Sequence, residues 1–428
     1  MDFEKSLEKY LSKEEIDKLI SSFSLTSKHG LLLNTNKISK ERFEEEFPNL
    51  IRHPFVPNGY IFDKDIYQFG KHIYHEMGCY YLQEPSAMMI SYLLNPNSND
   101  ILLDMCAAPG GKSVGAALLM NNEGVIVSND ISNSRAAILL NNIERMGIGN
   151  TLIINNDISK IYKDYPNYFS KIILDAPCSG SGMFRKDEEM KNDWSINKVE
   201  KFAQIQKELI LYAYYMLKEG GTLIYSTCSY SYEEDEEIID YLLRNSDAKL
   251  LDVDIDKSML YQDDKLRYGY HLFPHLFPGE GHYFCLVNKP GHDIEIVYNY
   301  KIAHTLDNLD DKYIKKYGDY YFYLPKDVKI KNLHILRYGL KIKERKGKDD
   351  IYDYHLAHYL DNSCYINIYN LNKDELISYL KGNTIKTDVD DGMILLTYKD
   401  INLSFAKASN NLIKNHFPKY LRNKNYLL

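Results

Sequence analysis

The sequence of 428 residues lacks the features of a membrane or secreted protein. No uninterrupted apolar stretch approaches the ~18 residues that a membrane helix needs, so we expect no membrane span. The six cysteines lie far apart and form no C-x-x-C pair, which favours free thiols in a reducing compartment. The first 20 residues predict one amphipathic helix of mixed charge rather than a signal peptide. We therefore expect a cytoplasmic protein.

The sequence is also short of positive charge and of tryptophan. It has 52 Lys and Arg against 60 Asp and Glu, a net charge of −8, and one Trp beside 38 Tyr. This balance does not suggest nucleic-acid binding, yet a local basic groove can bind nucleic acid even in an acidic protein. No internal repeat divides the chain, and its length suits about three domains of ~150 residues each.

Short apolar runs and helical segments alternate between residues 91 and 290. Helical patterns at 132–147 and 193–221 separate the runs, and 282–287 is expected as a final strand. The other expected strands, all apolar enough for burial on both faces of a parallel sheet, are 101–104, 125–130, 151–157, 171–178 and 221–228. This alternation predicts a doubly wound α/β domain that binds ligands at the carboxyl ends of its strands.

The regions on either side of this domain lack the alternation. Residues 1–90 mix helical periodicity with a strand-like piece at 30–39. After 290 we expect small α+β modules, a linker module at 291–365 and a second module at 366–428. Residues 341–350 are expected to form a charged, mostly basic loop within the first of them.

The segment LLDMCAAPGGKS (102–113) ends a predicted strand in a Gly-rich loop that opens a helix. Such a loop lets a ligand lie close to the backbone. A Walker A loop would need Gly where Cys106 stands, and the G-x-G-x-x-G fingerprint is absent. A tight turn without a ligand is the alternative, so this loop alone indicates only the edge of a cofactor site.

Carboxylates end the next two predicted strands. Asp130 ends the second strand, where it can bind a ribose diol, and Asp157 ends the third, where it can accept from an adenine amino group. Each could equally be a turn former or a helix N-cap. Two of them in register with the Gly-rich loop favour a nucleoside cofactor.

Cys178 and Cys228 follow the fourth and fifth predicted strands, in DAPCSGSG and STCSY. A free cysteine is most often a buried, inert side chain. Two cysteines at neighbouring strand ends, each among Ser, Thr or Gly, instead indicate a thiolate that attacks an electron-poor carbon. The residues alone leave open which of the two attacks.

CAAPGGKS, DAPCSGSG and YSTCSY, in this order, resemble the RNA 5-methylcytosine methyltransferases of the Nol/Nop/Sun (Fmu) family. YYLQEPSAM (80–88) and FPHLFPGEGHYF (273–284) resemble further blocks of the family. The tail from 391 resembles the PUA-like module of its bacterial 16S ribosomal RNA branch, RsmF. The resemblance implies a Rossmann-like methyltransferase core at 91–290, with an RNA-binding extension at 1–90 and a PUA-like RNA-binding module at 366–428.

The resemblance also implies S-adenosylmethionine as cofactor and RNA as partner, 16S ribosomal RNA or the small ribosomal subunit, for a monomeric enzyme. By resemblance, Cys228 attacks carbon 6 of cytosine, Cys178 assists release of the methylated RNA, and Asp175 hydrogen-bonds the ring near nitrogen 3. Gln83 and Ser86 would line the pocket for the target base. Residues implied for the cofactor are Cys106, Ala107, Ala108, Pro109, Gly110, Gly111, Lys112, Asp130, Arg135, Asp157 and Asp175.

The acidic and histidine-rich segments near these blocks have structural interpretations. Ser231 and Glu234 in SYEEDEEIID predict a capping box at a helix N-terminus. His275 and His282 are not spaced with other ligands as a metal site would be, so we expect a structural role and no metal.

Basic residues in the C-terminal region are candidates for phosphate contact. They are those of 341–348 together with Lys414, Lys419 and Arg422, and a solvated charged surface is the alternative. Rival functions are a tRNA cytosine-5 methyltransferase, a non-catalytic RNA-binding or ribosome-assembly factor, and methylation of DNA or a small molecule. Both cysteines and the full cofactor loop argue against the non-catalytic factor, and modules on both sides of the core favour a large nucleic-acid substrate.

Overall fold

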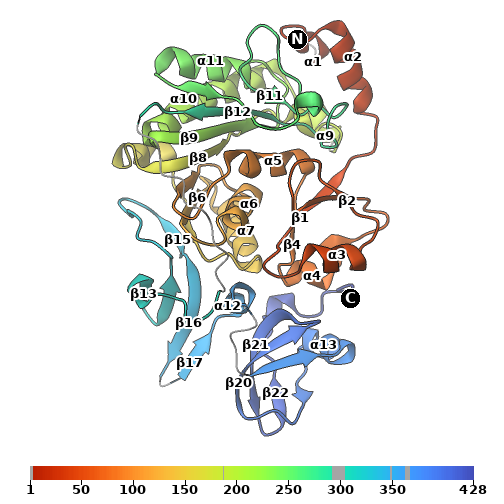
Figure 1. Ribbon diagram of the computed structural model, residues 1–428, viewed down its shortest axis with the longest axis vertical. Helices are drawn as coiled ribbons and strands as arrows, with labels where there is room; N and C mark the ends of the chain where they lie inside the picture. The colour runs from red at the N-terminus through yellow and green to blue at the C-terminus, as the bar shows by residue number, and fades with distance from the viewer. Residues whose placement is uncertain (1–2, 187, 292–303, 348, 362–366) are drawn as a thin grey trace.

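The computed structural model describes residues 3–186, 188–291, 304–347, 349–361 and 367–428 (Figure 1). Cys364 and parts of the predicted linker module lie outside these residues. Within them, no helix combines the length and the apolar character that a bilayer span requires.

The central sheet has the strand order β10-β12-β9-β8-β5-β6-β7-β15, and β11 pairs with β12. Strands β5 to β9 run parallel to their neighbours, whereas β12 and β15 pair antiparallel with β9 and β7. The bounds are β5 Ile101–Asp104, β6 Val125–Asn129, β7 Thr151–Ile154, β8 Phe169–Asp175, β9 Leu217–Thr227, β10 Lys249–Leu251, β11 Tyr270–His271, β12 Tyr283–Asn288 and β15 Ile335–Tyr338. The predicted doubly wound α/β fold is confirmed, and its order reverses between β5 and β8.

Helices cover both faces of this sheet because consecutive strand residues point to opposite sides. Leu103 and Val127 pack in one core with helices α10 and α11, whereas Leu102 and Ile126 pack in the other with α5, α6 and α7. The bounds are α5 Pro85–Leu94, α6 Gly111–Leu119, α7 Asn133–Arg145, α8 Ile158–Ile161, α9 Glu188–Asp193, α10 Ile196–Met216 and α11 Glu236–Asn245. Helix α10 ends at Met216 rather than at the expected Gly pair, because the following residues already begin β9.

The N-terminal region forms four short helices and a small sheet. The single helix expected over the first 20 residues is wrong, since Ser12 is a new N-cap whose side chain accepts from the Glu15 N–H. The helices are α1 Phe3–Leu7, α2 Lys13–Ser22, α3 Lys40–Glu46 and α4 Ile73–Glu76. The sheet, of order β2-β3-β1-β4, consists of β1 His29–Leu33, β2 Ile51–Arg52, β3 Gly59–Phe62 and β4 Tyr80–Leu82.

The chain after residue 303 forms two further sheets. The first has β13 Ile314–Tyr317, β14 Tyr320–Tyr323, β16 Leu340–Lys346 and β17 Asp349–Tyr352, with helix α12 Tyr354–Tyr359 after it. The second has β18 Ile368–Leu371, β19 Ile385–Lys386, β20 Gly392–Tyr398, β21 Ile401–Ser409 and β22 Leu412–Lys414, with helix α13 Lys373–Leu380. Strand β15 lies within the predicted linker module but belongs to neither sheet, because it pairs with β7 at the edge of the central sheet.

The basic loop expected at 341–350 is wrong. Most of this segment is strand β16, which pairs with β14 and β17. Its cations are also neutralised, since Lys343 lies 2.7 Å from Asp350, Arg345 pairs with the same carboxylate and Lys341 lies 3.1 Å from Asp353. Lys348 lies outside the described residues.

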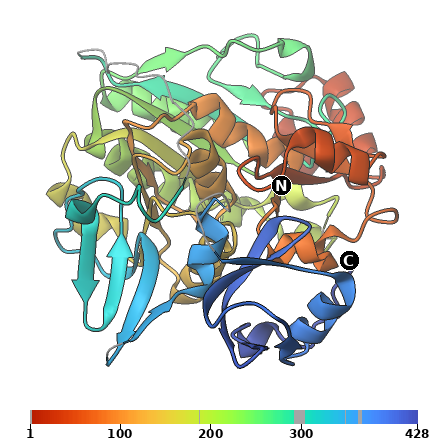
Figure 2. The same ribbon diagram turned by 60° about the horizontal axis from the view of Figure 1, so that its bottom comes forward.

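The N-terminal sheet and the second C-terminal sheet pack against each other (Figure 2). Phe43 and Tyr80 share one buried core with Leu396 and Ile413, although more than 300 residues separate the two pairs. Lys399, at the turn after β20, forms an ion pair with Glu46. The N-terminal region and the C-terminal module are thereby joined beside the domain that contains the central sheet.

Candidate active site

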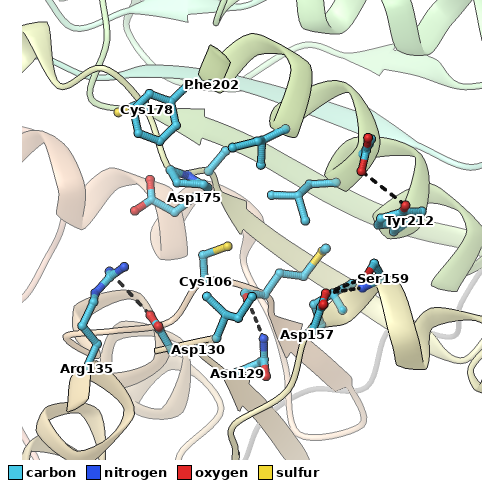
Figure 3. Close-up of a pocket in the computed structure, with 18 of the residues that line it drawn as sticks. Cys106, Asn129, Asp130, Arg135, Asp157, Ser159, Asp175, Cys178, Phe202 and Tyr212 are labelled. Carbon is cyan, nitrogen blue, oxygen red and sulfur yellow. Dashed lines mark hydrogen bonds and ion pairs between the residues drawn. The ribbon is translucent and has the colours of Figure 1, made fainter. Parts of the chain in front are cut away.

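A cavity of about 510 Å³ opens at the carboxyl ends of the parallel strands (Figure 3). We call its two sides the loop half, formed by the turns after β5, β6 and β7, and the thiol half, formed by the loops after β8 and β9. The loop half carries Cys106, Asp130 and Asp157, and the thiol half carries Asp175, Cys178 and Cys228. Apolar side chains of helix α10, Phe202, Ile205 and Leu209, close the remaining wall.

The Gly-rich loop takes its shape from backbone contacts. The Ala107 N–H donates to the Asn129 carbonyl at 2.7 Å, and Gly110 adopts a φ of 118° that favours glycine. A Cβ on Gly111 would lie 2.8 Å from the Gln83 side chain, so a larger residue there would require this side chain to move. Arg135 donates to the Ala108 carbonyl at 2.7 Å and so connects helix α7 to the loop.

The loop residues predicted to hold the cofactor do not all face the cavity. Cys106 lines it, but burial raises the pKa of this thiol well above its ordinary value. Ala107 and Ala108 are buried behind it, and Pro109 is exposed on the outer side. Of the loop residues 106–112, Cys106 alone lines this cavity.

Asp130 lies in the loop half, and one of its carboxylate oxygens has no hydrogen bond within the described residues. One carboxylate oxygen accepts from the Ser132 N–H at 2.9 Å. The other, Oδ2, is buried and has no hydrogen-bond partner in the described part of the chain, and the Arg135 Nη2 atom lies 3.5 Å from it. A buried orphan oxygen of this kind fits the hydroxyl donors of a ribose.

Asp157 is a helix N-cap, which its position in the sequence left open as an alternative to cofactor binding. It is the N-cap of helix α8 and accepts from the N–H of Ser159 at 3.0 Å and from its hydroxyl at 2.6 Å. These bonds lower its pKa, although burial opposes them. Asp157 also lines the cavity, so its N-cap role does not take it away from a ligand.

The two cysteines of the thiol half lie side by side. Their sulfur atoms are 3.2 Å apart, although 50 residues separate them in the sequence. Hydrogen bonding to Cys228, followed by burial, raises the pKa of Cys178 well above its ordinary value. Cys178 therefore holds its proton and can donate it to the sulfur of Cys228.

Asp175 lies beside this pair and has three partners. The Lys112 ammonium is 2.7 Å from one oxygen, and the Ser226 hydroxyl donates to the other at 2.8 Å. The His282 Nε2 atom is 3.3 Å from the same second oxygen. Burial raises the pKa of Asp175, but Lys112 and His282 outweigh it and hold this pKa well below its usual range. The carboxylate is ionised.

Two of these partners were assigned other roles from the sequence. Lys112 was expected to lie along the cofactor, but its side chain reaches across to Asp175. His282 was expected to be structural, and its Nε2 atom instead lies 3.3 Å from the same carboxylate. No spacing rule could indicate His282, because it lies 107 residues after Asp175.

The predicted capping box of Ser231 and Glu234 is wrong. Helix α11 begins at Glu236 with Asp235 as N-cap, and no side-chain bond caps it. Glu234 is instead fully buried, and it accepts hydrogen bonds from residues that follow each cysteine, Ser179 and Ser229. The carboxylate joins the two loops of the thiol half.

The predicted substrate residues lie in three different places. Gln83 packs beside Gly111, next to the Gly-rich loop. Ser86 is fully buried, donates to Glu84 and does not line the cavity. Lys414 and Lys419 are exposed on the C-terminal module and are not part of the cavity, while Arg422 donates to the Phe417 carbonyl at 2.9 Å.

One group of side chains in the described residues could hold a metal ion, namely Asp235, Glu236 and His271. All three are buried, and they already bond internally, with the His271 Nε2 atom 2.7 Å from Glu236 and the Thr227 hydroxyl donating to Asp235. His275 pairs with Glu15 at 3.1 Å and is not part of this group.

Family models match most of the chain. One described as 16S rRNA methyltransferase RsmB/F matches residues 91–287. The N-terminal domain of 16S rRNA methyltransferase RsmF matches residues 1–85, and the methyltransferase RsmF PUA domain matches residues 366–423.

Known relatives match over nearly the full length. A ribosomal RNA small subunit methyltransferase F from Psychromonas ingrahamii is 30% identical, over 96% of this chain and 95% of its own length. The protein of the same name from Vibrio cholerae is 30% identical over 92% of both chains. A tRNA (cytosine(49)-C(5))-methyltransferase from Pyrococcus abyssi is 39% identical, but over 54% of this chain and 72% of its own.

Solved structures of two other proteins have a similar fold. A methyltransferase homolog protein from Pyrococcus horikoshii superimposes with a TM-score of 0.57 and 27% identity, over 67% of this chain and 93% of its own. NSun6 from the same organism, solved with SFG, has a TM-score of 0.60 at 22% identity, over 68% and 98% of the two chains, which shows a shared fold.

The doubly wound sheet, with the Gly-rich loop and the cavity at its carboxyl edge, defines a Rossmann-like methyltransferase. More narrowly, the chain belongs to the ribosomal RNA small subunit methyltransferase F family. The family resemblance and the PUA-like module predicted from the sequence are thereby confirmed.

Proposed function

We propose that this protein methylates carbon 5 of cytosine in 16S ribosomal RNA, in the cytoplasm and as a monomer, through a covalent bond between Cys228 and the base. The observation that carries the proposal is the pair of sulfur atoms 3.2 Å apart beside the ionised Asp175. A single buried cysteine would support no chemistry, whereas two cysteines and a carboxylate at one cavity provide a nucleophile, a second thiol and a group that binds the base.

S-adenosylmethionine is the cofactor that the loop half fits. The orphan oxygen of Asp130 suits the ribose hydroxyls, the backbone surface near Cys106 suits the methionine portion, and Asp157 lies where the adenine edge would be. When bound, S-adenosylmethionine supplies a methyl group on a positively charged sulfur. The apolar wall from helix α10 then excludes water from the reacting atoms.

The first step falls to Cys228 and Asp175. Carbon 5 of cytosine is a poor nucleophile, and addition of the Cys228 thiolate to carbon 6 turns the ring into an enamine whose carbon 5 can accept a methyl group. The ionised Asp175 can accept a hydrogen bond from the amino group beside nitrogen 3, and its Lys112 partner can offset the negative charge that develops on the ring. The base must be unstacked for the thiolate to reach it.

The second step requires loss of the carbon 5 proton and expulsion of the Cys228 sulfur. The Cys178 sulfur lies 3.2 Å from that of Cys228, next to the carbon that Cys228 attacks. As a thiolate, Cys178 can accept the carbon 5 proton. The electrons of that C–H bond restore the double bond between carbons 5 and 6, and Cys228 leaves as a thiolate, which releases the methylated RNA.

The tRNA enzyme of Pyrococcus abyssi supports a second candidate substrate. Its name states cytosine-C5 methylation of tRNA, and its identity to this chain is 39%. The likeness covers 54% of this chain, whereas the small-subunit enzymes match 92% and more. The modules outside the shared part therefore favour ribosomal RNA over tRNA.

An assay with radiolabelled S-adenosylmethionine tests the proposal. The full chain is incubated with 16S ribosomal RNA, assembled small subunits, tRNA, DNA and cytidine, and the labelled nucleoside is identified after digestion. We expect 5-methylcytidine from 16S ribosomal RNA or small subunits. Label confined to tRNA would favour the second candidate, and RNA binding without any transfer would indicate a non-catalytic factor and overturn the proposal.

A further inference from the structure

Glu234 connects the two cysteine loops although it does not line the cavity. Its Oε1 atom accepts from the Ser179 N–H at 2.8 Å, and its Oε2 atom accepts from the hydroxyls of Ser179 and Ser229. Ser179 directly follows Cys178, and Ser229 directly follows Cys228. The Glu234 carboxylate therefore binds the backbone N–H of the residue after Cys178 and the side chain of the residue after Cys228.

The surroundings of Glu234 hold this carboxylate in place. Gln206 of helix α10 donates to Oε1 at 3.3 Å and to the Pro177 carbonyl at 2.8 Å, on the other side of Cys178. The Tyr225 hydroxyl donates to the backbone carbonyl of Glu234 at 2.6 Å. Glu234 is thus anchored to strand β9 and helix α10, two rigid elements of the catalytic domain.

We propose that Glu234 is the positioning residue that fixes the distance between the two thiols, acting through Ser179 and Ser229. This inference rests on the proposed function for its catalytic consequence, since release of the product requires Cys178 to stay beside Cys228. The geometric part, that Glu234 holds the sulfurs together, does not depend on which reaction they perform.

Substitutions of Glu234 separate its shape from its charge. Glu234→Ala leaves the buried Ser179 N–H and the Ser229 hydroxyl without their acceptor, so the two loops lose their common anchor. Glu234→Gln keeps one oxygen for the Ser179 N–H, and its amide can donate to a serine hydroxyl. If Glu234 acts by position, the Gln variant is close to wild type and the Ala variant is not.

Disulfide trapping measures the distance between the sulfurs without any substrate. A diazene oxidant accepts two electrons and two protons from the thiols, which joins the two sulfur atoms and leaves the hydrazine. We expect wild type and Glu234→Gln to form the Cys178–Cys228 bond, seen by mass spectrometry of the peptides, and Glu234→Ala to form it about tenfold more slowly. Equal rates for Glu234→Ala and wild type would overturn the proposal.

Turnover measures the catalytic consequence. For Glu234→Ala we expect kcat to fall by about 10- to 100-fold, which is typical of a small misplacement of reacting groups, with KM for RNA unchanged. A covalent protein–RNA complex should also accumulate, because release is impaired, and a merely destabilised protein would not show it. Glu237→Ala, in the same acidic segment but paired with Lys207 at the surface, is the matched control.

Further outcomes distinguish failure of the positioning role from failure of the proposed function. If Glu234→Ala does not fold, Ser229→Ala removes the link between Glu234 and the Cys228 loop, together with the bond that the Ser229 hydroxyl accepts from the Ser231 N–H, and should show the same changes to a smaller degree. If wild type makes no 5-methylcytidine but trapping still depends on Glu234, the proposed function fails and the positioning role stands. If wild type methylates RNA and Glu234→Ala matches it in kcat and in trapping, the positioning role fails alone.

Discussion

The two halves of the cavity are held in place by different kinds of contact. In the loop half, each functional group is fixed within its own turn or the next one. Asp157 caps the helix that it precedes, and the Ala107 N–H bonds the end of the neighbouring strand. A short stretch of sequence therefore contains nearly everything that shapes this half.

The thiol half is assembled from residues far apart in the chain. Asp175 depends on Lys112 and His282, which lie 63 residues before it and 107 residues after it. The cysteine loops depend on Glu234, which follows one of them closely and the other by more than 50 residues. We propose that the loop half sets how the cofactor binds and that the thiol half sets the rate of reaction, and the predictions below test this division.

The largest expected effects come from the two cysteines. Cys228→Ala removes the attacking group, so we expect no covalent RNA adduct and no methyl transfer. Cys178→Ala keeps the attack but loses the second thiol, so a denaturation-resistant protein–RNA complex should accumulate. Gel electrophoresis of labelled RNA with each variant measures both outcomes. Cys285→Ala, a buried cysteine away from the cavity, is the control, and the reverse pattern would exchange the two roles.

The Lys112–Asp175 pair comes next in expected size. Lys112→Met removes the cation that holds the pKa of Asp175 low, and we expect kcat to fall by about 10²- to 10³-fold, as for loss of one transition-state donor. Because the half-buried Asp175 would keep the Ser226 hydroxyl and His282 beside it, stability should fall by up to about 3 kcal/mol. Lys207→Met, at the surface of α10, is the matched control for both measurements.

The kcat/KM of Lys112→Met should also depend on pH differently from that of wild type. In wild type the pKa of Asp175 lies below its ordinary value, so the carboxylate stays ionised and its contribution is lost only in strong acid. Without Lys112, burial raises this pKa, and protonation begins at a higher pH. We therefore expect the kcat/KM of Lys112→Met to fall more steeply than that of wild type between pH 8 and 5. Parallel pH profiles would show that Lys112 does not control the charge of Asp175.

The division also explains which parts the sequence could predict. The sheet, the Gly-rich loop and the two cysteine-bearing strand ends follow from local periodicity, because parallel strands bring their carboxyl ends to one edge. Glu234 was misread as a cap, since its spacing from Ser231 suits a capping box and nothing local indicates a contact with Ser179. Lys112 and His282 reach Asp175 only through three-dimensional packing, so the spacing of residues in the sequence could not predict these contacts.

A smaller effect is expected in the loop half. Asp130→Asn weakens the orphan acceptor, and we expect KM for S-adenosylmethionine to rise about tenfold with kcat nearly unchanged. Asp157→Asn should raise this KM less, because the Asp157 carboxylate already bonds Ser159. Initial rates at varied cofactor concentration distinguish the two. A fall in kcat without a change in KM for Asp130→Asn would contradict the division between the halves.

The smallest effect concerns basic residues outside both halves. Lys414 and Lys419 are exposed and have no ion pair among the described residues, whereas Arg345 is paired with Asp350. If the first two contact phosphates, Lys414→Ala and Lys419→Ala should each weaken RNA binding a few-fold and reduce the slope of log affinity against log salt by about one. Arg345→Ala should change the slope little, because its charge is already neutralised. Equal slopes for all three variants and wild type would place RNA binding elsewhere and leave Lys414 and Lys419 as solvated surface.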